Sequence, residues 1–215
     1  MSECHLLDDA GRKGADPKAL AVRATGEPGA LVLLLEGLDS REPRVKYGCA
    51  KVLHAVSQTN PAVLYPAFDR FAALLSGRNK ILRWEAIRIL GNLAGADTEN
   101  RFEGLLEAYL APIPGPELIT AANTIQGAAA VAKAKPHLAG RIAREFLKVE
   151  GAAYKTPECR NVALGQVIDA FDEILVAVES RETVIDFVKR QLDNPRVSTR
   201  KKARAFLARH PEVRP

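Results

Sequence analysis

The chain has 215 residues, of which 47% are hydrophobic, 27% are charged and only 6% are aromatic, with a formal net charge of +5. This length is ample for a buried core, and the abundance of Ala and Leu favours helix-on-helix packing over sheets. The longest apolar run, residues 30–35, is far too short to cross a bilayer. We therefore expect a cytoplasmic protein that does not bind membranes, because the N-terminus also lacks an export signal.

Helix boundaries are marked along the chain by capping residues, prolines and glycines. Three prolines follow a capping side chain, as is common at the start of a helix: Asp16-Pro17, Asn60-Pro61 and Thr156-Pro157. Between such starts and the next glycine, apolar residues recur with helical spacing, and no window alternates like a strand. The pattern predicts eleven helices: 17–25, 28–38, 43–58, 61–76, 79–94, 99–110, 115–133, 136–149, 156–175, 180–192 and 196–209.

A short helical segment recurs along the chain at a nearly fixed interval. Residues 44–53 align without gaps with residues 81–90, which lie 37 positions later, and a weaker match follows after a further step of 36. Periods of this size indicate stacked helical hairpins, because one hairpin cannot bury its apolar face alone. We predict a flexible tail at 1–16, a single repeat domain over 17–210 and a C-terminal tail at 211–215. The domain holds an N-terminal helix and five hairpins: 28–58, 61–94, 99–133, 136–175 and 180–209.

The repeated segment resembles HEAT repeats, a class of armadillo-like helical repeat. Residues 39–43 supply the Asp- and Pro-containing turn, and Val45-Lys46 stands where HEAT units carry Val-Arg. Leu82-Arg83 fills the same place in the next unit, and Pro66 lies where first helices often kink. The interval is shorter than the roughly 40–47 residues of that class. The resemblance implies an all-α, right-handed α-solenoid whose second helices line a concave surface, and a non-catalytic scaffold that binds a protein partner there.

Equivalent positions of the two best repeats carry aromatic and basic side chains. Tyr47 aligns with Trp84 and Lys51 with Arg88, and each aromatic precedes its cation by one helical turn. Two neighbours extend this set, which we call the aromatic-basic strip: Tyr47, Lys51, His54, Trp84, Arg88 and Asn92. Aromatic residues and Arg are common interface anchors, so the strip is the predicted partner-binding surface. The alternative is that the aromatics pack between repeats and the cations are simply solvated.

The positive charge is concentrated at the C-terminal end. Residues 189–215 hold nine basic and two acidic side chains, a net charge of +7, which leaves −2 for the rest of the chain. Five of these residues form the basic C-terminal cluster: Arg200, Lys201, Lys202, Arg204 and Arg209. Such a cluster can bind a polyanion by counterion release. The alternative is a polar cap, which a terminal repeat needs in order to stay in solution.

No catalytic or cofactor-binding motif is present, so we expect no enzyme, cofactor, metal site or small-molecule substrate. The three cysteines, Cys4, Cys49 and Cys159, have no metal-binding spacing. Nucleic-acid binding is the alternative function. Its less favoured variant is a DNA glycosylase, because bacterial alkylpurine DNA glycosylases are built on HEAT-like repeats. In their helix a tryptophan precedes an aspartate by one turn, whereas Arg88 stands one turn after Trp84 here. Helix carboxylates such as Glu85, Asp169 and Asp172 are expected to be solvated.

Overall fold

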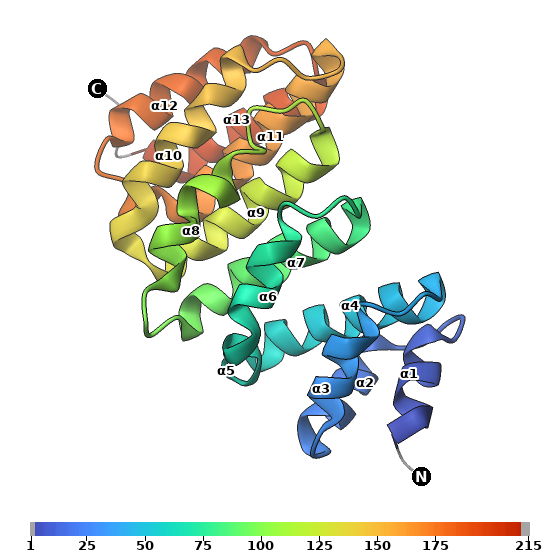
Figure 1. Ribbon diagram of the computed structural model, residues 1–215. Helices are drawn as coiled ribbons and strands as arrows, with labels where there is room; N and C mark the ends of the chain where they lie inside the picture. Colours follow the sequence, from blue (N-terminus) through green and yellow to red (C-terminus); the bar gives the residue numbers. More distant parts are fainter. Residues whose placement is uncertain (1–2, 212–215) are drawn as a thin grey trace. The chain divides into compact units, whose positions relative to one another are not determined.

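The computed structural model describes residues 3–211, and within this range every regular element is helical (Figure 1). All eleven predicted helices are present, with ends that shift by a few residues. The chain divides into two compact units, one up to Arg101 and the other from Phe102, whereas the sequence predicted one continuous repeat domain. None of the helices in the described part is long and apolar enough to span a membrane. The last four residues of the predicted C-terminal tail, 212–215, lie outside the described residues.

The first unit consists of helices packed around two long second helices. Its α-helices are α1 (Glu3–Gly11), α2 (Pro17–Gly26), α3 (Ala30–Gly37), α4 (Pro43–Thr59), α5 (Pro61–Leu64), α6 (Phe68–Leu74) and α7 (Lys80–Leu93). Helix α4 packs against α1, α2 and α3 on one side and against α7 on the other. The apolar stripes predicted for α4 and α7 are buried, including Leu53 and Leu90 at the seam. Cys49 belongs to this core, and burial raises the pKa of its thiol to about 11.

Helix α1 was not expected, because its residues were assigned to a flexible tail. Leu6 and Ala10, one turn apart, are buried in the first unit, and α1 packs along α4. Gly48 makes this possible: a Cβ atom added at Gly48 would lie 2.0 Å from the carbonyl oxygen of Ala10. The two backbones therefore approach at a point where no side chain fits. The residues that hold α1 in place lie on α4, so the sequence of the segment by itself is typical of a polar tail.

The predicted helix 61–76 is divided at Pro66. Residues Tyr65–Ala67 form a 3-10 turn between α5 and α6, because proline has no backbone N–H to continue the α-helical ladder. The kink expected from the resemblance to HEAT repeats is thus confirmed. The helix predicted over 99–110 begins at Arg101, where a carboxylate oxygen of Asp97 accepts a hydrogen bond from the Arg101 backbone N–H at 2.9 Å.

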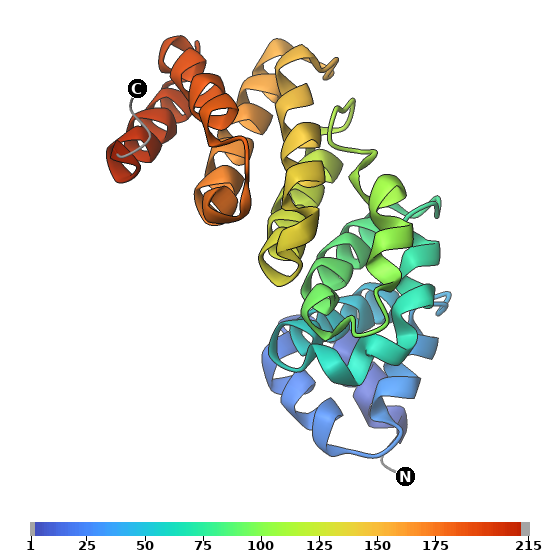
Figure 2. The ribbon, with the colours of Figure 1, turned by 90° about the vertical axis from the view of Figure 1, so that its left-hand side faces the viewer.

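The second unit repeats the same arrangement of paired helices. Its α-helices are α8 (Arg101–Leu110, which begins at the boundary), α9 (Leu118–Ala134), α10 (Ala139–Leu147), α11 (Pro157–Ile174), α12 (Arg181–Arg190) and α13 (Val197–Arg209). The second helices α9, α11 and α13 pack in succession, as the yellow-green to red helices of Figure 2 show. Phe171 lies between Phe146 and Phe187 in edge-on contacts, with ring centroids 5.5 and 5.6 Å apart. This aromatic row joins α10, α11 and α12 into one core.

We expect Gly48→Ala to destabilise the protein by about 1–3 kcal/mol, because the added methyl group forces α1 and α4 apart. The free energy of unfolding from urea denaturation measures the effect. Gly104→Ala is the matched control: Gly104 lies inside α8 with no atom near an added Cβ, so this change should stabilise the helix by about 0.5–1 kcal/mol. Equal stability of Gly48→Ala and wild type would show that α1 is not docked on α4.

Candidate functional site

The aromatic-basic strip lies along the seam between α4 and α7, where side chains of the two helices are joined by hydrogen bonds. Asn79 caps α7, since its side-chain oxygen accepts from the backbone N–H groups of Ile81 and Leu82. Its amide nitrogen also donates to the hydroxyl of Tyr47 over 3.2 Å. Tyr47 is half-buried and thus links the two repeats while keeping part of its ring exposed. Its hydrogen bond with Asn79 shows that Tyr47 takes part in packing between repeats, and its role as an interface anchor stays a prediction.

A buried carboxylate lies at the centre of the seam. Glu85 is only 6% exposed, although it was expected to be solvated. One of its oxygens, Oε1, accepts a hydrogen bond from Nη2 of Arg88 at 2.8 Å, and the other, Oε2, lies 3.3 Å from Nδ1 of His54. We call these three residues the polar cluster. The expectation of a solvated Glu85 was wrong because α4 covers this position of α7, and the sequence does not reveal the covering residue.

Burial shifts the protonation of the polar cluster. The pKa of His54 falls to about 4, first because burial disfavours the imidazolium and second because Arg88 repels it. Burial raises the pKa of Glu85, and the charges of Arg88 and Lys51 offset part of this rise. His54 is therefore neutral near pH 7, and the attraction between Glu85 and Arg88 is the main charge interaction in the cluster.

Several polar atoms at this seam are buried without a hydrogen bond. They include Oε2 of Glu85, whose approach to His54 lacks hydrogen-bonding geometry, together with Nε of Arg88 and Nε of Arg83. Buried polar atoms are nearly always paired in native proteins, so unpaired ones need an explanation such as an absent partner. The side chain of Arg88 itself is 33% exposed, and Lys51 is exposed beside it. The flexible side chains of Arg88 and Lys51 thus lie between the polar cluster and solvent, whereas α4 covers its other side.

The remaining members of the strip are placed by the same packing. Asn92 donates to the hydroxyl of Ser57 at 2.9 Å, and this hydroxyl in turn donates to the carbonyl oxygen of His54. Asn92 is therefore engaged within the seam. Trp84 is half-buried on α7. The structure brings His54 and Arg88 together around Glu85, which the sequence prediction missed. Glu85 aligns with Gly48 one repeat earlier, but the sequence alone does not show that this position faces a neighbouring helix.

The basic C-terminal cluster is largely tied to α11 and to the turn before α13. Lys202 binds Asp169, and Arg209 binds Asp172 at 2.8 Å, so these two carboxylates are paired rather than free in solvent. Arg200 donates to the carbonyl oxygen of Asn194 at 2.7 Å. Three of the five cations thus join α13 to its surroundings, and whether the cluster binds a polyanion stays a prediction. The other two, Lys201 and Arg204, are exposed.

Comparison with known proteins identifies the fold. No protein-family model and no curated protein matches the chain by sequence. Among solved structures, a designed armadillo repeat protein is 14% identical with a TM-score of 0.63, covering 95% of this chain and 90% of that one. An engineered protein is similar at 14% identity and a TM-score of 0.61, covering 98% and 89%. The karyopherin Kap121p is 16% identical with a TM-score of 0.67. This chain is covered over 98% of its length but spans only 23% of that protein.

The fold is an all-α solenoid of HEAT/armadillo-like repeats. At these sequence identities the likeness shows the fold alone. Within it, the strip and the polar cluster belong to the second helices of two successive repeats in the first unit.

The polar cluster predicts a pH dependence of stability that His54 controls. Between about pH 6.5 and 4 the unfolded chain binds a proton on His54 that the folded protein does not, so the free energy of unfolding should fall as the pH is lowered. Urea denaturation at pH 7 and pH 4.5 should therefore show a larger loss for wild type than for His54→Gln. Glu85 acts in the opposite direction, because its raised pKa stabilises the fold on acidification, but it is present in both proteins. Equal losses in the two proteins would contradict a buried, neutral His54.

Proposed function

We propose that this protein is a non-catalytic repeat scaffold that binds an extended segment of a protein partner along the α4–α7 seam. In HEAT arrays this side, formed by second helices, is the concave one. The observation that carries the proposal is the polar cluster, in which a buried carboxylate oxygen and a guanidinium nitrogen lack partners beneath exposed, flexible side chains. The half-buried rings of Tyr47 and Trp84 lie on the same two helices and supply apolar area beside it.

The unpaired atoms fit a polypeptide ligand. Glu85 Oε2 needs a donor, and Nε of Arg88 needs an acceptor. An extended backbone presents an N–H and a C=O at every residue, so one segment can satisfy both once it displaces Lys51 from the surface. A buried polar atom without a partner carries a desolvation penalty, so a ligand that pairs with these atoms is favoured. The half-buried aromatics then act as anchors around this centre.

Related folds bind peptides, which supports the same function here. Kap121p has been solved bound to the extreme C-terminus of the protein phosphatase Cdc14p, and its TM-score to this chain in that complex is 0.66. A designed armadillo repeat protein has been solved in complex with the peptide (KR)4, with a TM-score of 0.59. Stacked second helices offer such ligands a continuous surface with a repeated side-chain pattern. A DNA glycosylase is less well supported, because Glu85 is buried and bonded to Arg88 rather than exposed to a nucleotide.

Partner capture tests the proposal. Immobilised wild type should retain a specific protein from a nuclease-treated lysate, and Trp84→Leu combined with Lys51→Gln should weaken this capture by about 10-fold or more. Leucine keeps apolar volume at residue 84, so the melting temperature should change little. The retained protein is identified by mass spectrometry and its affinity is then measured by calorimetry.

A control pair shows whether the effect is local. Val176→Ser with Lys201→Gln also removes one exposed apolar group and one positive charge, but in the second unit. This control should bind the partner like wild type. Capture of the same proteins by wild type and by the Trp84→Leu, Lys51→Gln protein would refute binding at the seam.

Nucleic-acid binding is a second candidate function, supported by Lys201 and Arg204, which are exposed on α13. If it is correct, the affinity for single-stranded DNA should fall steeply between 50 and 200 mM salt, by roughly 10-fold for two to three phosphate contacts. Fluorescence anisotropy measures the slope. An affinity that does not change over this range, or one unchanged in Lys201→Gln with Arg204→Gln, would exclude this surface as a polyanion site.

A further inference from the structure

A second site lies on the other side of α4, where it meets α1 and α2. A cavity of about 360 Å³ opens there, and its lining includes four basic side chains and no carboxylate: Arg12, Lys13, Arg44 and Lys51. We call it the basic pocket. Tyr47 and Pro43 border it on α4, and Pro17 and Leu20 border it on α2. Its volume is in the range of small-ligand sites.

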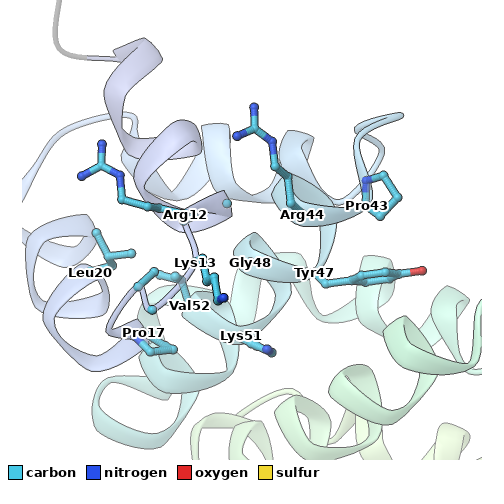
Figure 3. Close-up of a pocket in the computed structure, with 14 residues that line it drawn as sticks. Arg12, Lys13, Pro17, Leu20, Pro43, Arg44, Tyr47, Gly48, Lys51 and Val52 are labelled. Atoms are coloured by element: carbon cyan, nitrogen blue, oxygen red, sulfur yellow. The ribbon is translucent and has the colours of Figure 1, made fainter.

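Two of the four cations are already neutralised. Arg12 forms an ion pair with Asp9 at 3.2 Å, and Arg44 pairs with Glu42 at 2.8 Å. In Figure 3 their guanidinium groups extend in the same direction, whereas Lys13 and Lys51 point away from them. Within the described residues neither of these lysines forms an ion pair. The pocket therefore holds two ammonium groups whose charge is uncompensated.

The repeat pattern explains why this charge is left over. Lys51 aligns with Arg88, and Gly48 aligns with Glu85. In the later repeat the glutamate neutralises the cation over 2.8 Å, but in the earlier repeat a glycine stands in its place, because α1 approaches too closely for a side chain. Lys51 is near enough to lower the pKa of Glu85, yet it makes no ion pair with it. The close packing of α1 thus removes the carboxylate that would balance the pocket.

We propose that the basic pocket binds a phosphate monoester. Such a group carries about −1.5 to −2 charges at pH 7, which matches the two uncompensated ammonium groups. The cavity is larger than a phosphoryl group, so it also has room for the side chain or small molecule that carries it. Tyr47 and Lys51 belong to both the pocket and the strip. A phosphorylated side chain on the partner segment, which rests on the proposed function, is therefore one source, and a free small phosphate ester is the other.

A nucleic-acid backbone fits the basic pocket less well. Binding a phosphodiester chain takes a row of cations along an extended groove. Here the two unpaired ammonium groups line one compact pocket, and the chain before Lys189 has a net charge of −2. The pocket therefore suits a single, doubly charged group.

Calorimetry on the full chain tests the proposal with four probes: a blocked Gly/Ala peptide carrying one phosphoserine, its unphosphorylated form, free O-phosphoserine, and single-stranded DNA without a terminal phosphate. We expect saturable binding of the phosphopeptide, at least about 10-fold tighter than that of the unphosphorylated peptide. Lys13→Gln should weaken it about 5-fold or more, and Lys13→Gln with Lys51→Gln should abolish it. The control, Lys18→Gln with Lys46→Gln, removes the same charge outside the pocket and should bind like wild type.

The four probes distinguish a phosphate group on a partner from a free phosphate ester, and they define the results that would overturn the proposal. If free O-phosphoserine binds as tightly as the phosphopeptide, the pocket accepts a small phosphate ester; tighter binding of the phosphopeptide indicates a ligand borne on a partner. Unchanged phosphopeptide binding in the Lys13→Gln, Lys51→Gln protein overturns the proposal. So does a result in which single-stranded DNA binds more tightly than the other probes and loses its affinity in that variant. Lys13 lies outside the strip, so its result bears on the pocket alone. Trp84 lies outside the pocket, so loss of partner capture in Trp84→Leu alone bears on the seam.

Discussion

The first unit depends on how closely its helices approach one another, at the contact of α4 with α1 and at the contact of α7 with α4. Gly48 in α4 and Glu85 in α7 occupy the same position of the repeat. Gly48 faces α1, and Glu85 faces α4. Glycine allows the backbone of α1 to lie directly against α4. Glutamate at the same position instead leaves space for His54 and Arg88 to meet a buried carboxylate. The same repeat position thus makes a close backbone contact with α1 in α4 and a polar cluster with α4 in α7.

The helical period was sufficient to predict most of the fold. The stripes at Leu53 and Leu90 repeat with the right spacing, and residues predicted as core from that spacing are buried. The period could not predict α1, because Leu6 and Ala10 lie between acidic residues and too few apolar positions follow one another. Its stability as a helix comes from the surface of α4. A short segment whose order depends on a distant glycine has no signal of its own.

Only part of the candidate site could be predicted, because its contacts also join residues that are distant in the sequence. Alignment of the repeats paired Tyr47 with Trp84, but the hydrogen bond of Tyr47 is with Asn79, and His54 lies beside Glu85, 31 residues away. These contacts run diagonally across the seam and follow the crossing of two helices, which a linear alignment does not contain. The ion pairs of α13 are different. Arg209 and Asp172 are 37 residues apart, close to one repeat, so the period itself could have revealed them.

Lys51 has a consequence for communication between the two faces of α4. Its charge lowers the pKa of Glu85 on one side, and its side chain lines the basic pocket on the other. An anion bound beside Lys51 cancels part of the positive potential of Lys51 at Glu85. The pKa of Glu85 then rises, and its ion pair with Arg88 weakens as it takes up a proton. Thermodynamic reciprocity requires the converse as well, with protonation of Glu85 altering the affinity for the anion. A titration of Glu85 by nuclear magnetic resonance, with and without phosphate, would reveal this cross-talk or its absence.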